Sequence, residues 1–117
     1  MALTSTASLP VLLVDDEPQL LHGVSIALRT AGISAVETLD DSRAVMPLLA
    51  RRAVGVLVLD LAMPHVSGQL LLGQIATAHP DLPVILMTAT NDLDTAVQCM
   101  QAGAIDYLVK PVEKDRL

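Results

Sequence analysis

The stretch VLVLDLAMPHVSG, residues 56–68, places a carboxylate directly after an uninterrupted apolar run and then turns through a proline and a glycine. An apolar run of this kind is typical of a strand that is buried on both faces. Such a strand gains nothing from ending in a charge, because burying an unpaired carboxylate costs free energy. We therefore expect Asp60 to lie at the open end of a parallel sheet and to have a chemical role there.

The rest of the chain alternates between segments typical of strands and segments typical of helices. We expect strands at residues 11–14, 33–38, 54–59, 84–87 and 105–109. Three helices are expected from Pro18 to Gly32, from Asp41 or Ser42 to near Arg52, and from Ser67 to near Ala78. A fourth helix is expected from Asn91 or Asp92 to near Gly103, and Val97 and Met100 are among its apolar residues. A last helix is expected after Pro111. Pro47 is expected to kink the second helix or to delay its start. This alternation predicts a three-layer α/β domain with a doubly wound, five-stranded parallel sheet.

Polar residues follow four of the five expected strands: Asp15 with Asp16, then Asp60, Thr88 and Lys110. In a parallel sheet of this kind, ligands gather at the carboxyl ends of the strands, so we expect these side chains to face one another. Crowded carboxylates repel unless a cation joins them, and oxygen ligands at this density suit Mg²⁺. Asp60 would be the nucleophile toward a phosphoryl group, whose charge Lys110 would share and to which the Thr88 hydroxyl would donate.

Composition narrows the function classes. The net charge is −6 with only seven basic residues, which argues against direct binding of nucleic acid by this domain. Cys99 is the only cysteine, so an internal disulfide and a multi-cysteine metal site are excluded. Neither a signal peptide nor a membrane-spanning apolar run is visible, and we expect a cytoplasmic domain without membrane contact. We expect one domain at residues 10–117, preceded by a tail at residues 1–9.

Four stretches in this order, VLLVDDEP, VLVLDLAMPHVSG, VILMTA and DYLVKP, resemble the receiver domain of bacterial two-component response regulators. The resemblance runs from about Pro10 to Leu117, nearly the whole chain. It implies a flavodoxin-like receiver fold with strand order 2-1-3-4-5. It also implies a signalling phosphoacceptor rather than a turnover enzyme, in which Asp60 takes a phosphoryl group from a histidine kinase in a Mg²⁺-dependent reaction.

The resemblance assigns roles to further residues. Asp16 would bind Mg²⁺ directly, Asp15 largely through water, and the backbone carbonyl of Ala62 would be another ligand. Thr88 and Lys110 would hold the phosphoryl group. The backbone amide of Ala89 would assist them, and the Lys110–Pro111 bond would be cis.

On phosphorylation, the resemblance implies that Thr88 moves toward the phosphate and that Tyr107 turns inward. The surface formed by the fourth expected helix, the fifth strand and the last helix, residues 92–117, would thereby change and control an effector domain. That effector is expected to be transcriptional and to lie outside this chain, which ends early in the expected last helix. A homodimer through the same surface is a further expectation.

Other interpretations stay open at this point. Asp15 and Asp16 could simply cap the helix that Pro18 opens, and Asp60 could initiate a turn. A dehalogenase-like phosphatase would need a second Asp where this chain has Ala62, and a flavin carrier would need aromatic residues beyond Tyr107. A receiver that only docks partners is the remaining alternative.

Overall fold

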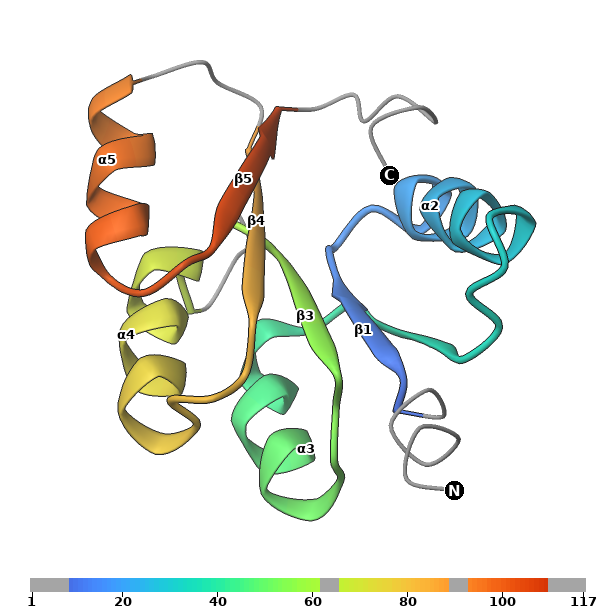
Figure 1. Ribbon diagram of the computed structural model, residues 1–117, viewed down its shortest axis with the longest axis horizontal. Helices are drawn as coiled ribbons and strands as arrows, with labels where there is room; N and C mark the ends of the chain where they lie inside the picture. Colours follow the sequence, from blue (N-terminus) through green and yellow to red (C-terminus); the bar gives the residue numbers. More distant parts are fainter. Residues whose placement is uncertain (1–8, 62–65, 89–92, 110–117) are drawn as a thin grey trace.

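A computed structural model describes residues 9–61, 66–88 and 93–109 (Figure 1). The tail expected at residues 1–9, except for Leu9, and the helix expected after Pro111 lie outside the described residues. The strands are β1 (Val11–Val14), β2 (Val36–Leu39), β3 (Val56–Asp60), β4 (Val84–Thr88) and β5 (Asp106–Val109). The helices are α2 (Pro18–Thr30), the short 3₁₀ helix η1 (Ser42–Ala44), α3 (Val45–Arg51), α4 (Gly68–Ala78) and α5 (Leu93–Gln101).

All five strands form one parallel sheet with the order β2-β1-β3-β4-β5, which confirms the predicted fold. From β1 the chain winds first toward β2 and then, through β3, toward the opposite edge. The winding therefore reverses between β1 and β3, and in sheets of this type ligands bind at the carboxyl ends of the strands at that point. The fold thus directs attention to the residues that follow Val14 and Leu59, which are paired in register.

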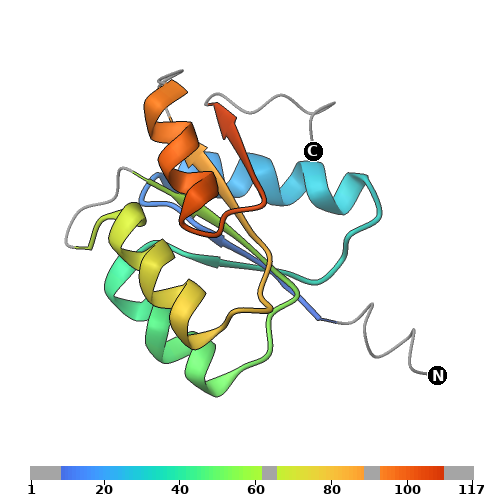
Figure 2. The same cartoon turned by 60° about the vertical axis from the view of Figure 1, so that its left-hand side comes forward.

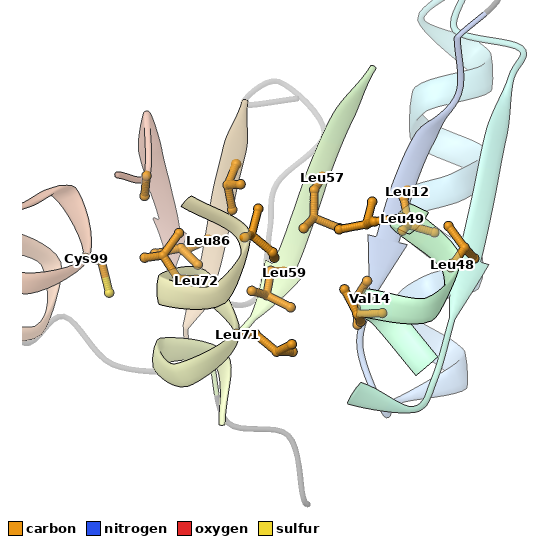
Figure 3. Close-up of a cluster of buried hydrophobic side chains, with 14 residues drawn as sticks. Leu12, Val14, Leu48, Leu49, Leu57, Leu59, Leu71, Leu72, Leu86 and Cys99 are labelled. Carbon is orange, nitrogen blue, oxygen red and sulfur yellow. The ribbon is translucent and has the colours of Figure 1, made fainter. Parts of the chain in front are cut away.

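Helices cover both faces of the sheet, which gives the three expected layers (Figure 2). On one face, α3, α4 and α5 pack over a cluster of buried aliphatic side chains, several of which meet in Figure 3. On the other face, α2 buries Leu21, Val24 and Leu28 against the strands at helical spacing. Because the strands are covered on both faces, a run without polar residues such as that preceding Asp60 is the composition that the fold requires.

The second strand begins three residues later than expected, at Val36 rather than at residue 33. The reason lies in how α2 ends: Gly32 adopts the left-handed region with φ 100°, and the Ile33 amide donates to the Leu28 carbonyl at 2.9 Å. These bonds complete the helix terminus and use Ile33 for it, so strand pairing starts only where the Val11 amide reaches the Ala35 carbonyl.

The second expected helix is divided into η1 and α3. The Asp41 side chain accepts the Arg43 amide at 2.9 Å and caps η1, as predicted for this position. Pro47 is the third residue of α3, where the missing amide would have no partner within the helix. The α-helical part therefore starts late, at Val45, which is the delayed start that Pro47 was expected to cause.

Two of the apolar residues of α5 are exposed, although they lie in a helix that packs on the sheet. Val97 is 45% exposed and Met100 is 43% exposed, whereas Cys99 is only 2% exposed. Helix α5 therefore turns its cysteine, and not these two larger side chains, toward the sheet. Among the described residues, no helix combines the length and the apolar character needed to cross a membrane.

Candidate functional site

Three aspartates converge where β1 and β3 end. Val14 pairs with Leu59 in register, so the next residues of the two strands, Asp15 and Asp60, come at the same level of the sheet. Asp16 follows directly, and one carboxylate oxygen from each of the three aspartates lies within 4.8 Å of the others. The prediction that these carboxylates would be brought together is confirmed.

The cluster is buried on one side and open on the other. Asp15 is 0% exposed and Asp60 is 2% exposed, whereas Asp16 is exposed. By strand alternation, Asp15 and Asp60 fall on the same face as Leu13 and Val58, which is the face covered by α2. Two carboxylates are thus held out of bulk water beside a third that solvent reaches, an arrangement that favours a bound cation.

The alternative interpretation of Asp15 as a residue that supports the start of the helix opened by Pro18 is partly right. The Asp15 carboxylate accepts the Glu17 amide at 2.9 Å and so stabilises the turn into α2. Glu17 itself, however, is the N-cap residue of α2, and its side chain makes no capping bond. Asp15 therefore shapes the turn as well as contributing to the cluster, while a purely structural role leaves the burial of Asp60 beside it unexplained.

The donor set fits a hard divalent cation. It consists of carboxylate oxygens from two adjacent strand ends, which is the ligand chemistry that Mg²⁺ uses in proteins. Asp16 is exposed, so solvent reaches this side of the cluster.

Thr88 lies at the same edge of the sheet. It is the last residue of β4, it is 7% exposed, and the preceding Met87 pairs with Asp60. The Leu61 amide donates to the Met87 carbonyl at 3.0 Å, so that the pairing of β3 with β4 continues past the aspartate. Thr88 therefore lies at the same edge of the sheet as Asp60, one residue beyond its partner in register, and its role toward a phosphoryl group stays a prediction.

Tyr107 is half-buried in β5 and packs against the cluster under α4 and α5. It pairs with Leu86, while Thr88 pairs with Val109. Since Leu86 and Thr88 alternate with Met87, Thr88 and Tyr107 lie on the same face of neighbouring strands, two register steps apart. This relationship is what a coupling between the two residues requires.

Several predicted residues cannot be placed. Ala62, Ala89, Lys110 and Pro111, with the expected cis bond between the last two, lie outside the described residues. Cys99 is described, and its burial raises the pKa of its thiol, which agrees with a packing role rather than a nucleophilic one.

Two residues near the cluster escaped functional notice in the sequence. Ser42, expected only as a possible helix cap, is 1% exposed, and its hydroxyl accepts the Val66 amide at 3.1 Å. Gly68, noted only as a turn residue, lies so close to β3 that a Cβ would come within 2.7 Å of the Asp60 carbonyl oxygen. Neither contact has a local sequence signal, because each joins residues from separate elements.

Residues 11–117 match the family model described as the response regulator receiver domain. The chain belongs to this family. The receiver domain fold and the acidic cluster at the carboxyl ends of β1 and β3 agree with that membership.

Curated relatives of this receiver domain are transcriptional regulators and other response regulators. The response regulator protein FleR of Pseudomonas aeruginosa is 46% identical over 103 residues, which cover 88% of this chain and 22% of FleR. The DNA-binding transcriptional regulator NtrC of Escherichia coli is 43% identical over 105 residues, 90% of this chain and 22% of NtrC. The receiver domain thus spans less than a quarter of the length of these two relatives.

Solved structures agree with the assignment. A response regulator receiver domain protein from Clostridium thermocellum superposes with a TM-score of 0.82 at 31% identity, covering 92% of this chain and 86% of that one. The BeF₃-activated receiver domain of DrrB superposes with a TM-score of 0.79 at 30% identity, covering 92% of this chain and 89% of that one. DrrB is an OmpR/PhoB homologue from Thermotoga maritima.

Proposed function

We propose that this receiver domain carries a transient phosphoryl group on Asp60 and takes it from a histidine kinase. The observation that carries the proposal is the convergence of Asp15, Asp16 and Asp60, two of them buried, at the point where the winding of the sheet reverses. A carboxylate in this position is a nucleophile with a place for a cation beside it.

The transfer breaks the bond between phosphorus and a kinase histidine nitrogen and forms a bond between phosphorus and an Asp60 carboxylate oxygen. The histidine nitrogen leaves with the electron pair of the broken bond. Transfers of this type need mainly positioning and charge neutralisation. Bound Mg²⁺ would neutralise charge on the phosphoryl oxygens and on the carboxylates.

The roles of the single residues follow from the family resemblance. It implies that Asp16 would ligate Mg²⁺ directly, that Asp15 would act largely through water, and that the Ala62 carbonyl would be a further metal ligand. It assigns phosphoryl binding to the Thr88 hydroxyl, supported by its position at the end of β4, and to Lys110 and the Ala89 amide, which lie outside the described residues.

The signal would leave the site through Thr88 and Tyr107. The phosphoryl group adds about −1.5 to −2 charges to Asp60, and Thr88 would move toward it. Tyr107, on the same face of the sheet, would then turn inward and change the output surface, residues 92–117, which includes α5 and β5. Coupling of this sort is typically worth about 1–3 kcal/mol, which shifts a pre-existing equilibrium.

The partners follow from the relatives as proposals. We expect a histidine kinase as phosphoryl donor and an effector that controls transcription, as the names of FleR and NtrC suggest for the longer proteins. A homodimer through the output surface is a further expectation, as is a cytoplasmic location.

Loss of the phosphoryl group is proposed to be moderate to slow. Residues 62 and 90, two positions after Asp60 and Thr88, are alanine and threonine, and neither is an acid or amide suited to orienting an attacking water. Ala62→Asn should change the rate of phosphate loss, measured after removal of the donor, and an unchanged rate would contradict this part of the proposal.

The experiment that tests the proposal is incubation with Mg²⁺ and acetyl phosphate, followed by intact-mass measurement. We expect a phosphoryl adduct on the wild-type protein and on Asp81→Asn, a matched variant at an exposed aspartate between α4 and β4. Asp60→Asn should show no adduct. An adduct that survives in Asp60→Asn, or a wild-type protein that takes no phosphoryl group, would overturn the assignment.

A further inference from the structure

Helix α4 carries no charged residue, although much of it faces solvent. More than half of its residues are exposed, and its sequence, GQLLLGQIATA, contains no acidic or basic side chain. Each of the other helices that the structure describes carries at least one. Surfaces of soluble proteins typically have charged residues at about 25–35% of positions. The exposed side of α4 therefore has the composition of the centre of an interface, where charge is depleted.

This side of α4 places a protruding side chain next to an open space. Leu70 is 57% exposed, the highest value among the large exposed apolar side chains of the described residues. One turn further on, a Cβ at Gly73 would meet nothing within 4 Å. Gly73 lines a shallow groove of about 660 Å³ between α4 and Met46 of α3, two helices that lie side by side in Figure 2. A second helix can therefore approach closely at Gly73 and contact Leu70.

Four exposed residues form what we call the α4 stripe: Leu70, Gly73, Gln74 and Thr77. Residues at these spacings lie on one face of a helix. The spacings are three, one and three residues, so the stripe is symmetric about the point between Gly73 and Gln74. A two-fold axis at this point would set a second α4 antiparallel to the first, with Leu70 of each copy facing Thr77 of the other. A two-fold interface requires this kind of self-complementarity, and antiparallel helices bring opposite dipole ends together.

The polar groups of the α4 stripe can be buried at little cost. The Thr77 hydroxyl donates to the Gly73 carbonyl at 3.1 Å, so it keeps its partner when solvent is removed. Gln74 lies beside the proposed axis, and its amide is both a donor and an acceptor, so it can pair with the same residue of a second copy. Association through this stripe therefore leaves neither group without a hydrogen bond.

The charge of the chain favours a second copy as the partner. The net charge is −6, so two copies repel each other where their acidic surfaces meet. On α4 this repulsion is smallest, because no carboxylate lies on the helix. Nucleic acid or a strongly charged protein would find no opposite charge there, whereas a second copy presents an equally uncharged face.

We propose that two copies of this domain associate through the α4 stripe and the adjoining groove, with the two α4 helices antiparallel. This surface differs from the output surface, residues 92–117, and its use requires neither Mg²⁺ nor a phosphoryl group. The proposal therefore stands independently of the function of Asp60. Each copy contributes little more than one helix, so the interface lies at the small end of the range for protein pairs and the dimer is weak.

The experiment is sedimentation equilibrium over a concentration series in EDTA without a phosphoryl donor. It compares glutamate substitutions of three exposed apolar residues on three helices: Leu70 on α4, Val97 on α5 and Ile26 on α2, with exposures of 57%, 45% and 47%. Leu70→Glu should weaken the dimer at least about tenfold, because it places a carboxylate from each copy in the interface. Val97→Glu and Ile26→Glu, which add the same charge elsewhere, should leave the dissociation constant within about twofold of wild type.

A charge pair tests the antiparallel arrangement. Leu70→Glu and Thr77→Lys lie two turns apart on one helix and do not pair within a copy, but they face each other between copies. Each change alone should weaken the dimer, and the double variant should bind about tenfold more tightly than either. A double variant no tighter than the single ones would overturn the arrangement. A wild-type protein that stays monomeric up to about 1 mM, or equal weakening by Val97→Glu or Ile26→Glu, would overturn the use of α4.

Discussion

Gly68 offers the sharpest test of how the fold supports the site. A Cβ at this position would lie 2.5 Å from the Leu61 Cα and 2.7 Å from the Asp60 carbonyl oxygen. Ordinary contacts between carbon atoms are about 3.5–4.0 Å, so the alanine methyl group falls short by about 1 Å. Both obstructing atoms belong to the backbone, and no side-chain rotation can relieve the overlap.

The variant Gly68→Ala must therefore push the start of α4 away from the end of β3. This movement strains the bond from the Gly68 amide to the Leu61 carbonyl and loosens the packing of Leu71 and Ile75, which are buried against the sheet. Overpacking of this kind costs typically about 1–3 kcal/mol. We expect a loss of about 3 kcal/mol, the upper end, because the backbone has to move.

Gly73→Ala is the matched control in the same helix. A Cβ at Gly73 meets nothing within 4 Å, and the residue is exposed within α4. Replacing a helical glycine by alanine in open space stabilises by about 0.5–1 kcal/mol. The two variants carry the same chemical change and should shift stability in opposite directions.

Urea unfolding of both variants, followed by circular dichroism, measures the difference. We expect a gap of about 3.5–4 kcal/mol in the free energy of unfolding between Gly68→Ala and Gly73→Ala, the sum of the overpacking and helix-propensity effects. Phosphorylation of Gly68→Ala by acetyl phosphate should also slow, because the displaced atoms include the Asp60 carbonyl. A Gly68→Ala protein as stable as Gly73→Ala would refute the reasoning about the close approach of α4 and β3.

Three further predictions concern single side chains. In EDTA, Asp60→Asn should raise the free energy of unfolding by about 1–3 kcal/mol, because the substitution removes repulsion within the carboxylate cluster. Urea unfolding measures this gain, and the absence of a gain would contradict the repulsion. Leu71→Ala should lower the free energy of unfolding by about 2–5 kcal/mol, because it leaves a cavity under α4. A smaller loss would mean that neighbouring side chains move in to fill this cavity. Burial raises the pKa of the Cys99 thiol above its ordinary value of 9.0, so the folded state favours the protonated form. Stability should therefore fall as pH rises above this value, less so in Cys99→Ala, and alkylation by iodoacetamide at pH 8.5 should be slower in the native protein than in urea.

The acidic cluster was predictable because its geometry follows from a pattern and a rule. The carboxylates stand directly after apolar runs, and parallel strands bring their carboxyl ends to one edge of the sheet. Neither step needs knowledge of long-range contacts. The neighbour relations of the strands were different: periodicity shows that five strands exist, whereas the order β2-β1-β3-β4-β5 came from the family resemblance.

The late start of β2 and the burial pattern of α5 both depend on tertiary contacts. Residues 33–35 have the composition of a strand, but hydrogen bonds at the end of α2 use Ile33 first. In α5, Val97 and Cys99 are both apolar, and only the position of the helix over the sheet decides which is buried. Local preference proposes such assignments, and tertiary packing chooses among them.

Hydrogen bonds of Ser42 and Gly68 help to hold the backbone near the carboxylate cluster. Three like charges held this close would lower their energy by moving apart if the backbone allowed it. Here the loops that carry them are tied at the Asp15, Leu61, Val66 and Gly68 amides. Because these bonds limit spreading, a bound cation would relieve the repulsion, and a site that is organised in advance would bind such an ion at a smaller entropic cost.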